Sequence, residues 1–267
     1  MSKHPSTATL RQQFLELKNN FPVAGLKTGT EIEDMGFAEI SEMHEICRPA
    51  SLTVKIGGPE ARRDMRESLA IGVDVILAPM VETEYALSNF VAAFDEICSE
   101  VHHVHKIPKL AINLETSTAM QNLDTMIRSS AFQRLSQVTI GRGDLSKSMN
   151  LGVDDNEVIA ITASALKKIK NAGKLTSVGG GWNVASVAAT SSKFNSTTIN
   201  TRHVALENNS AFQKNAEDSL YAALVFEVKL YDYFAIRFPE RKTFYLSRKK
   251  VLAQRLGLHE LQQHKPA

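Results

Sequence analysis

Short apolar segments alternate along the chain with longer amphipathic ones. The apolar segments are rich in Val and Ile and contain few polar residues, which is typical of parallel strands that are covered on both faces. They lie at Pro22–Lys27, Leu52–Ile56, Val73–Ala78, Lys109–Leu114, Gln137–Ile140, Leu175–Val178 and Thr197–Leu206. This pattern predicts seven strands, and the last of them reads as one unbroken run.

Segments of helical period separate these strands. In the segment Glu84–Val101, for example, Leu87, Val91, Phe94 and Ile97 recur at the spacing of one helix face. The predicted helices are Thr7–Asn19, Ala38–Cys47, Glu60–Ile71, Glu84–Val101, Ser117–Ser130, Glu157–Ala172 and Ala211–Phe234. Repeated strand–helix units indicate an α/β fold with a parallel sheet.

The number and spacing of the strands favour a TIM-type (β/α)8 barrel, although no segment stands out as the eighth strand. A doubly wound sheet would be expected to carry a Gly-rich phosphate loop after its first strand, and the turn Thr28–Glu31 does not have that pattern. The chain of 267 residues suits one barrel domain. We assign the barrel to residues 1–240 and a helical tail, which could pack on a neighbouring subunit, to residues 241–267.

Composition and charge exclude several classes of protein. Hydrophobic residues make up 43% of the chain, which is enough for a large core, and the net charge of +2 gives no reason to expect nucleic acid as a partner. No apolar stretch approaches the length of a membrane span, and no secretory signal is visible at the start. Two cysteines, Cys47 and Cys98, cannot build a disulfide framework, so we expect a reduced, cytoplasmic protein.

Charged residues and glycines gather where the predicted strands end. Because the active site of such a barrel lies at the carboxyl ends of its strands, Lys55, Glu115 and Asp144 should face one cavity. Glu115 and Asp144 follow successive strands, and two carboxylates with room for water are what Mg²⁺ or Mn²⁺ accepts. A carboxylate at a strand end can also simply cap the next helix, and that alternative stays open for Asp144 and for Glu82–Thr83.

Three phrases at these positions resemble the HpcH/HpaI aldolase and citrate lyase β-subunit superfamily. They are Val73–Leu87 (VDVILAPMVETEYAL), Ala111–Asp124 (AINLETSTAMQNLD) and Ile140–Gly152 (IGRGDLSKSMNLG), in the order and at the spacing of that family. The resemblance covers about Val23 to Leu206. It implies a TIM barrel, often oligomeric, that makes or breaks a carbon–carbon bond through an enolate of pyruvate, oxaloacetate or an acyl-CoA.

The resemblance also implies roles for individual residues. Glu115 and Asp144 inherit the binding of Mg²⁺ or Mn²⁺, and the backbone around Arg142, Gly143 and Asp144 is expected to hold the substrate carboxylate. Glu82 is expected to support the metal shell through water or a hydrogen bond.

Two departures from the family pattern stand out. Lys55 lies where the family commonly has an arginine; it keeps the charge, so we expect it to bind the carboxylate or stabilise the enolate, but it loses the bidentate fork. The family's histidine near the end of the preceding strand is absent, because the chain reads Glu31-Ile32-Glu33-Asp34 there. Glu33 is then a candidate base, and Arg202 either reaches the substrate or pairs with a carboxylate.

Three hypotheses follow. The first is a metal-dependent carbon–carbon lyase or class II aldolase, a homo-oligomer acting on a small 2-keto acid or a related enolate donor. The second is a CoA-ester lyase of the citrate lyase β type, in which Arg62, Arg63 and Arg66 could hold the CoA phosphates. The third is a barrel that has lost catalysis and serves as a binding or scaffold subunit.

Overall fold

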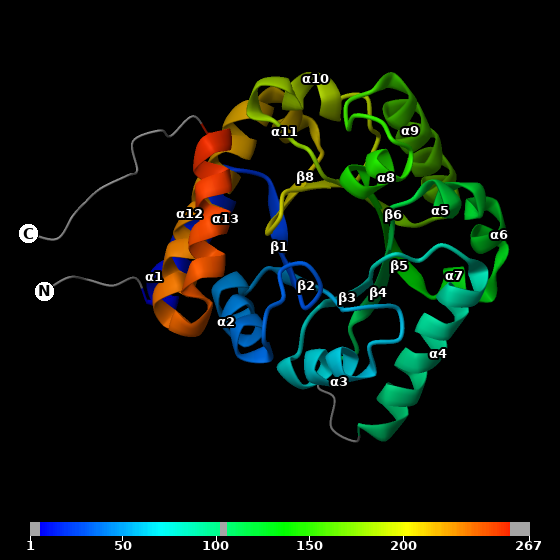
Figure 1. Ribbon diagram of the computed structural model, residues 1–267, viewed down its shortest axis with the longest axis horizontal. Coiled ribbons are helices and arrows are strands. Elements are labelled where there is room, and N and C mark those ends of the chain that lie inside the picture. The colour runs from blue at the N-terminus through cyan, green and yellow to red at the C-terminus, as the bar shows by residue number, and fades with distance from the viewer. Residues whose placement is uncertain (1–5, 102–105, 257–267) are drawn as a thin grey trace, which may run out of the picture.

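The computed structural model describes residues 6–101 and 106–256, and its strands form one closed barrel ringed by helices (Figure 1). Each strand pairs with the next in sequence, and the last pairs with the first. The strands are β1 (Val23–Gly29), β2 (Ser51–Lys55), β3 (Val75–Ala78), β4 (Lys109–Leu114), β5 (Leu135–Gly141), β6 (Leu175–Gly179), β7 (Thr198–Asn200) and β8 (Val204–Glu207). The predicted barrel is therefore confirmed.

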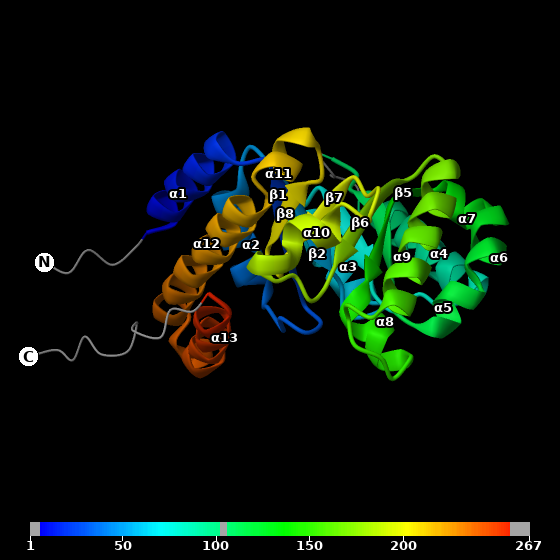
Figure 2. The ribbon, with the colours of Figure 1, turned by 90° about the horizontal axis from the view of Figure 1, so that it is seen from above.

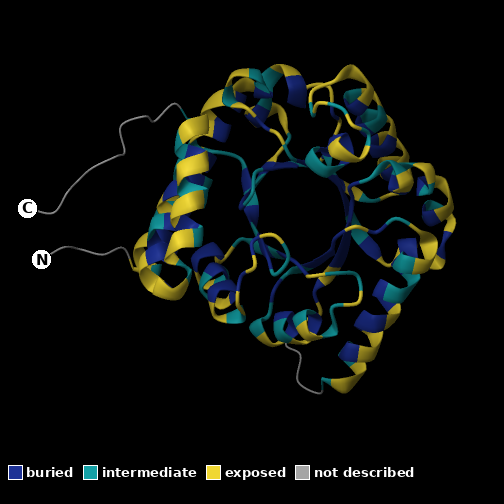
Figure 3. Ribbon diagram, viewed as in Figure 1, coloured by how far each residue is buried: buried dark blue, intermediate teal, exposed yellow. Residues whose placement is uncertain are grey.

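Helices cover the outside of the barrel. Their buried faces turn inward and their exposed faces outward, which is the arrangement that an amphipathic period predicts (Figure 3). The α-helices are α1 (Thr7–Asn20), α2 (Phe37–Cys47), α3 (Arg62–Ile71), α4 (Glu84–Glu100), α5 (Ser117–Gln121), α6 (Leu123–Arg128), α7 (Ser130–Gln133), α8 (Arg142–Ser148), α9 (Asn156–Asn171), α10 (Val187–Ser191), α11 (Ser210–Lys214), α12 (Ala216–Arg237) and α13 (Lys242–Arg255). Short 3-10 turns lie at Val184–Ser186 and Pro239–Arg241.

The prediction of one strand over Thr197–Leu206 is wrong. The run folds back on itself as a hairpin, so β8 is antiparallel to both β7 and β1. The turn is closed by Thr201, whose backbone N–H and side-chain hydroxyl donate to the carbonyl of Val204 at 2.9 and 3.0 Å. The eighth strand that the sequence pattern did not reveal is thus the second half of this run.

Two predicted helices are also broken. The segment Ser117–Ser130 forms α5, α6 and the start of α7, because the chain leaves helical geometry at Ser129 and turns at Asn122. The segment Ala211–Phe234 is interrupted at Asn215, between α11 and α12. At Ser129 the hydroxyl donates to the carbonyl of Met126 and accepts from the backbone N–H of Phe132, so it competes with the helix for backbone hydrogen bonds.

The C-terminal helix α13 packs on α12 of the same chain at the side of the barrel, and α12 lies between α13 and α1 (Figures 1 and 2). The ring of Tyr245 stacks on that of Phe234 with 5.3 Å between centroids, and Lys249 donates to Asp232 at 2.7 Å. The helical extension expected after the barrel is therefore present, and the rest of that tail, residues 257–267, lies outside the described residues. No helix in the described part of the chain has the length and apolarity to cross a bilayer.

Candidate active site

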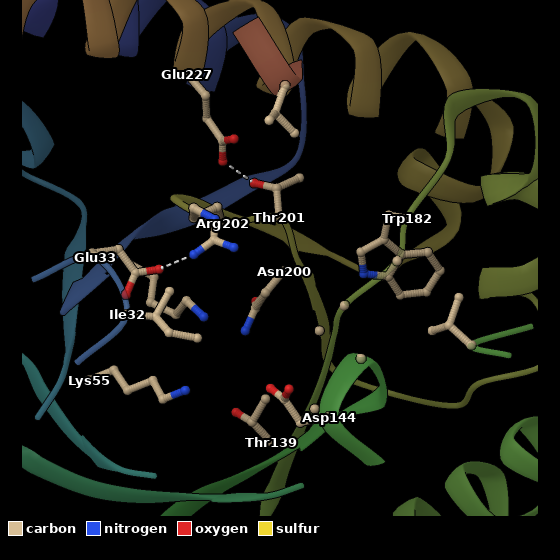
Figure 4. Close-up of a pocket in the computed structure, with 18 of the residues that line it drawn as sticks. Ile32, Glu33, Lys55, Thr139, Asp144, Trp182, Asn200, Thr201, Arg202 and Glu227 are labelled. Carbon is tan, nitrogen blue, oxygen red and sulfur yellow. Dashed lines mark hydrogen bonds and ion pairs between the residues drawn. The ribbon is translucent and has the colours of Figure 1, made fainter. Parts of the chain in front are cut away.

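A cavity of about 490 Å³ opens at the end of the barrel where strands β1–β7 finish (Figure 4). Side chains from most of these strands point into it, including Lys55, Thr139 and Asn200, and Asp144 faces them from the first turn of α8. The walls are completed by Leu224, Glu227 and Tyr231 of α12 and by α13. Charged groups from widely separated parts of the sequence therefore share one space.

Lys55 and Glu115 form the buried centre of this cavity. The Lys55 ammonium lies 2.6 Å from Glu31 and 3.4 Å from Oε1 of Glu115, and the same Oε1 accepts a hydrogen bond from the Asn113 side chain at 2.8 Å. Burial opposes the charge on Lys55, but Glu115 and Glu31 outweigh it, so its pKa is raised. The two carboxylates therefore favour the charged form of Lys55.

Gly141, the last residue of β5, makes room for Glu115. A Cβ atom at Gly141 would lie 2.6 Å from both Cγ and Oε1 of Glu115, so any side chain there would displace the carboxylate. Gly180, with φ of +90°, lets the loop after β6 approach the backbone of Gly143, because a Cβ atom at Gly180 would lie 2.6 Å from the Gly143 nitrogen. These glycines let three loops approach one another closely around Glu115.

Threonines, and not Glu82 or Glu115, cap the helices α4 and α5 at this rim. The Thr83 and Thr116 hydroxyls accept hydrogen bonds from the backbone of Ala86 and Ala119 at the starts of α4 and α5. Asp144 lies inside the first turn of α8, where its carboxylate faces the cavity and accepts a bond from Lys147 at 2.9 Å. The capping alternative thus does not account for Glu115 or Asp144.

The oxygen atoms at this end of the cavity suit a hard divalent cation. Oε2 of Glu115 and the side-chain oxygens of Asn113 and Asn200 are buried and have no hydrogen-bond partner among the described residues. Burying a polar atom without a partner is costly, so such atoms indicate a ligand or water. No group of three or more His, Cys, Asp or Glu that could hold a metal occurs in residues 6–101 and 106–256. Glu115 and Asp144 would therefore share a cation with substrate and water.

Glu33 and Arg202 meet at the opposite side of the cavity, where Nη1 of Arg202 donates to Glu33 at 2.8 Å (Figure 4). Burial tends to raise the pKa of Glu33, but Lys27, His203 and Arg202 outweigh it and hold that pKa below its ordinary value. Arg202 thus pairs with a carboxylate and also lines the cavity, where it is accessible to a substrate, so the two alternatives predicted for it do not exclude each other.

The remaining predicted residues fall in different places. Gly143 lines the cavity. The Arg142 side chain is fully buried outside the cavity lining, where it donates to the carbonyl of Gly180 at 2.9 Å and lies 4.5 Å from the Trp182 ring. The Glu82 carboxylate accepts a bond from Thr116 at 2.6 Å, one residue after Glu115, and does not line the cavity either. The structure therefore brings Lys55, Glu33, Gly143, Arg202, Glu115 and Asp144 together, but not Arg142 or Glu82.

Glu227 is a buried residue of this site that the sequence did not indicate. Its Oε1 accepts bonds from the Thr201 hydroxyl and the backbone N–H of His203, both at 2.6 Å, so it fixes the β7–β8 turn. It lies in the middle of α12, among the buried apolar residues of that helix. A carboxylate on a buried helix face is unusual, and this was the one signal in the sequence that could have indicated a functional role for Glu227.

The rim of the cavity is basic on the side of α13. Arg248, Val251, Leu252 and Arg255 line it, and their spacing places them on one helix face. By contrast, none of Arg62, Arg63 and Arg66 lines the cavity: Arg62 and Arg66 pair with Glu96 and Glu100 on the outside of the barrel. The cluster on α3 thus gives no support to a CoA site in this cavity.

A family model for the HpcH/HpaI aldolase/citrate lyase family matches residues 35–223, well over half of the chain. The chain belongs to the HpcH/HpaI aldolase/citrate lyase family. Among curated proteins none matches it significantly. The resemblance inferred from the three phrases is therefore confirmed, and membership places the chain among lyases of the aldolase and citrate lyase type.

Solved structures of this family share the fold at low sequence identity. A family protein from Burkholderia cenocepacia J2315 has a TM-score of 0.55 at 14% identity, over 74% of this chain and 83% of its own. A HpcH/HpaI aldolase from Desulfitobacterium hafniense DCB-2 gives 0.52 at 12%, over 79% and 86%. The citrate synthase SbnG gives 0.55 at 12%, over 82% and 89%. At such identities the likeness concerns the fold alone.

Proposed function

We propose that the protein is a carbon–carbon lyase or aldolase that depends on Mg²⁺ or Mn²⁺ and acts through the enolate of pyruvate, oxaloacetate or a related 2-keto acid. The observation that carries the proposal is the buried, unpartnered Oε2 of Glu115, which shares a cavity with Asp144 and Lys55. A divalent cation held by Glu115 and Asp144 would supply the positive charge that favours an enolate.

The protein's own side chains account for binding and orientation. Lys55 presents a buried positive charge to an anionic substrate, and its contacts to Glu31 and Glu115 hold it in place. Gly143 leaves its backbone accessible to a substrate carboxylate, because nothing lies within 4 Å of a Cβ at that position. Asn113 fixes the Glu115 carboxylate through a hydrogen bond, which keeps Oε2 directed to the cavity and not to a protein donor.

The test is calorimetric titration with oxalate, a planar mimic of the pyruvate enolate, with and without Mn²⁺. We expect binding only when the metal is present, and we expect Glu115→Gln and Asp144→Asn to weaken it by about 100-fold or more, because each removes a charged metal ligand. Thermal unfolding of each variant controls for misfolding. Equal binding without metal, or in both variants, would contradict the proposal, and no binding at all would favour the scaffold subunit.

A CoA-ester lyase remains the second candidate. The observation in its favour is the basic and apolar face of α13 at the mouth of the cavity, formed by Arg248, Val251, Leu252 and Arg255, because a long thioester substrate needs both kinds of contact there. Turnover of acyl-CoA but not of free acids would identify this activity.

Two further properties are part of the proposal. Cys47 and Cys98 are both free, which suits a reducing compartment such as the cytoplasm. Family resemblance supports a homo-oligomer, and sedimentation of the purified protein tests it directly.

A further inference from the structure

The proposed reaction needs a group that takes up and returns a proton, and the family histidine that stood as its candidate is absent from this chain. We infer that Lys27 is that group: its amine removes the proton from the carbon next to the carbonyl of a bound 2-keto acid and gives it back in the reverse direction. The inference rests on the proposed function, and the experiment below separates the failure of one from the failure of the other.

The backbone of β1 holds Lys27 firmly in place. Its N–H donates to the carbonyl of His203 at 2.8 Å, and its own carbonyl lies 2.9 Å from Nδ1 of the His203 ring. The side chain lines the same cavity as Lys55, Glu115 and Asp144. Lys27 therefore reaches the substrate space from the wall opposite α8, and its attachment to both β8 and β2 leaves the strand little freedom to move.

The amine of Lys27 differs from those of the other lysines of the cavity, Lys55 and Lys147, in having no partner. Among the described residues it makes no hydrogen bond and no ion pair, whereas Lys55, Lys147 and Arg202 are paired with Glu31, Asp144 and Glu33 respectively. A cation held in an ion pair is a poor proton acceptor, because the carboxylate stabilises its charged form. Lys27 is the lysine of this cavity whose nitrogen is left for a ligand.

The surroundings of Lys27 favour its neutral form. Burial is the main cause; Lys55 and Arg202 add to it, Glu33 and Glu115 oppose it, and the result is a lowered pKa. Lys55, in the same cavity, is instead held in an ion pair with Glu31 at 2.6 Å. An ion-paired lysine serves as a fixed charge, whereas a lysine whose surroundings favour the neutral amine is suited to act as an acid and base.

The other titratable groups around Lys27 are already engaged. Glu33 is paired with Arg202, Glu227 accepts two bonds from the β7–β8 turn, and His203 is buried with its Nδ1 on the Lys27 carbonyl. Burial of the Tyr231 hydroxyl raises its pKa, so it stays protonated. Glu115 and Asp144 are assigned to the cation. Lys27 is thus the one group around this space that combines access, a free nitrogen and a tendency to be neutral.

The step balances as follows. The neutral amine of Lys27 accepts a proton from C3 of bound pyruvate, the electrons of that C–H bond form the C2–C3 double bond, and the carbonyl electrons move to O2. Without an electrophile the ammonium returns a proton to C3. Because the ammonium protons exchange with water in between, pyruvate in heavy water should acquire deuterium at C3. This half-reaction can be measured without knowing which electrophile the enzyme uses.

The experiment follows the C3 methyl signal of pyruvate by NMR in heavy water with the full chain and Mg²⁺. We expect wild type to exchange these protons and Lys27→Met to do so at least about 100-fold more slowly. Lys27→Arg should be equally slow, because a guanidinium stays protonated. Lys174→Met is the matched control: burial also lowers the pKa of Lys174, but it lies outside the cavity, so exchange should be unchanged.

Further readouts make the outcome decisive. The wild-type exchange rate should rise with pH along one titration below 10.5, the ordinary pKa of lysine, and Lys27→Arg should lack that titration. Oxalate binding with Mg²⁺ should persist in both Lys27 variants, which shows that the site has folded.

The outcomes separate the two proposals. Full exchange in Lys27→Met with oxalate binding intact overturns the inference alone. Absence of oxalate binding in wild type overturns the proposed function. Borohydride reduction that attaches pyruvate to Lys27 would overturn the proton-transfer role in favour of an imine.

Discussion

The two sides of the cavity differ in how their charges are used and in how they relate to the family. Glu115 and Asp144 lie inside the matched region 35–223, and their side keeps buried oxygens without protein partners. Lys27, Glu33 and Glu227 lie outside that region, and there Glu33 and Glu227 are engaged in ion pairs or hydrogen bonds. The family match thus covers the residues proposed to hold the cation, whereas Lys27 and Glu33 of the β1 side, Glu227 of α12 and all of α13 lie beyond it.

The largest effect should come from filling the space beside Glu115. In Gly141→Ala the new Cβ would lie 2.6 Å from the carboxylate, so we expect metal-dependent oxalate binding to be lost as completely as in Glu115→Gln. Forcing an extra methyl group into this contact should also lower the free energy of unfolding by about 1–3 kcal/mol. Calorimetry and urea unfolding measure the two effects.

Gly143→Ala is the matched control for stability, because nothing lies within 4 Å of a Cβ at that position. It stands in α8, where alanine is the better helix former, so the variant should be as stable as wild type or about 0.5–1 kcal/mol more so. Equal destabilisation by both substitutions would show that the close contact between Gly141 and Glu115 does not cause the loss of stability in Gly141→Ala.

The next effect concerns the other side of the cavity and depends on pH. The folded-state pKa of Glu33 is lowered, so its interactions stabilise the protein above 4.5, its ordinary pKa, and that stabilisation is lost as the pH falls through the folded value. Arg202→Met removes one of the causes. At neutral pH it should lower the free energy of unfolding by about 1–2 kcal/mol.

The difference in the free energy of unfolding between Arg202→Met and wild type should shrink as the pH is lowered below 4.5. Urea unfolding between about pH 3 and about pH 7 measures this difference. Arg134→Met is the control, since Arg134 pairs with Asp95 on the exposed surface. Its effect should stay below about 1 kcal/mol. A pH-independent difference for Arg202→Met would mean that Arg202 stabilises the fold by packing alone.

The smallest effect should come from the mouth of the cavity. Replacing both Arg248 and Arg255 by alanine should weaken binding of citrate, which extends beyond the enolate site, by about fivefold to tenfold. Binding of oxalate should not change, because oxalate occupies only the proposed cation site beside Glu115 and Asp144. Lys250→Ala, on the same helix but outside the cavity lining, should affect neither ligand. Equal citrate binding in all three proteins would show that α13 does not contact substrate.

The sequence predicted most strands because each one is a continuous apolar run, and a buried parallel strand requires little else. It could not predict the turn at Thr201–His203, which contains no Gly, Pro or Asn and is fixed by Glu227, a residue 26 positions away on another element. Local pattern and tertiary contact disagree there, and the tertiary contact prevails.

The same reasoning explains the site. Glu115, Asp144 and Lys55 could be predicted to converge because strand ends in a barrel meet at one face. The direction of the Arg142 side chain could not, because it depends on Asp154, the Gly180 carbonyl and the Trp182 ring, which come from two later segments. Glu82 follows strand β3, but its carboxylate accepts a hydrogen bond from Thr116 and does not line the cavity.

The reversed strand β8 limits how this enzyme can change. In a barrel of parallel units each loop at the active-site face can grow or shrink without disturbing the sheet, which gives a new specificity a place to arise. Here three consecutive residues, Thr201, Arg202 and His203, serve as hairpin turn, cavity wall and support of β1 at once. An insertion between them would shift the register of β8 against β1 and open the barrel. Divergence of substrate preference must therefore proceed by substitution at this turn, or by changes in α13, which lines one side of the cavity mouth.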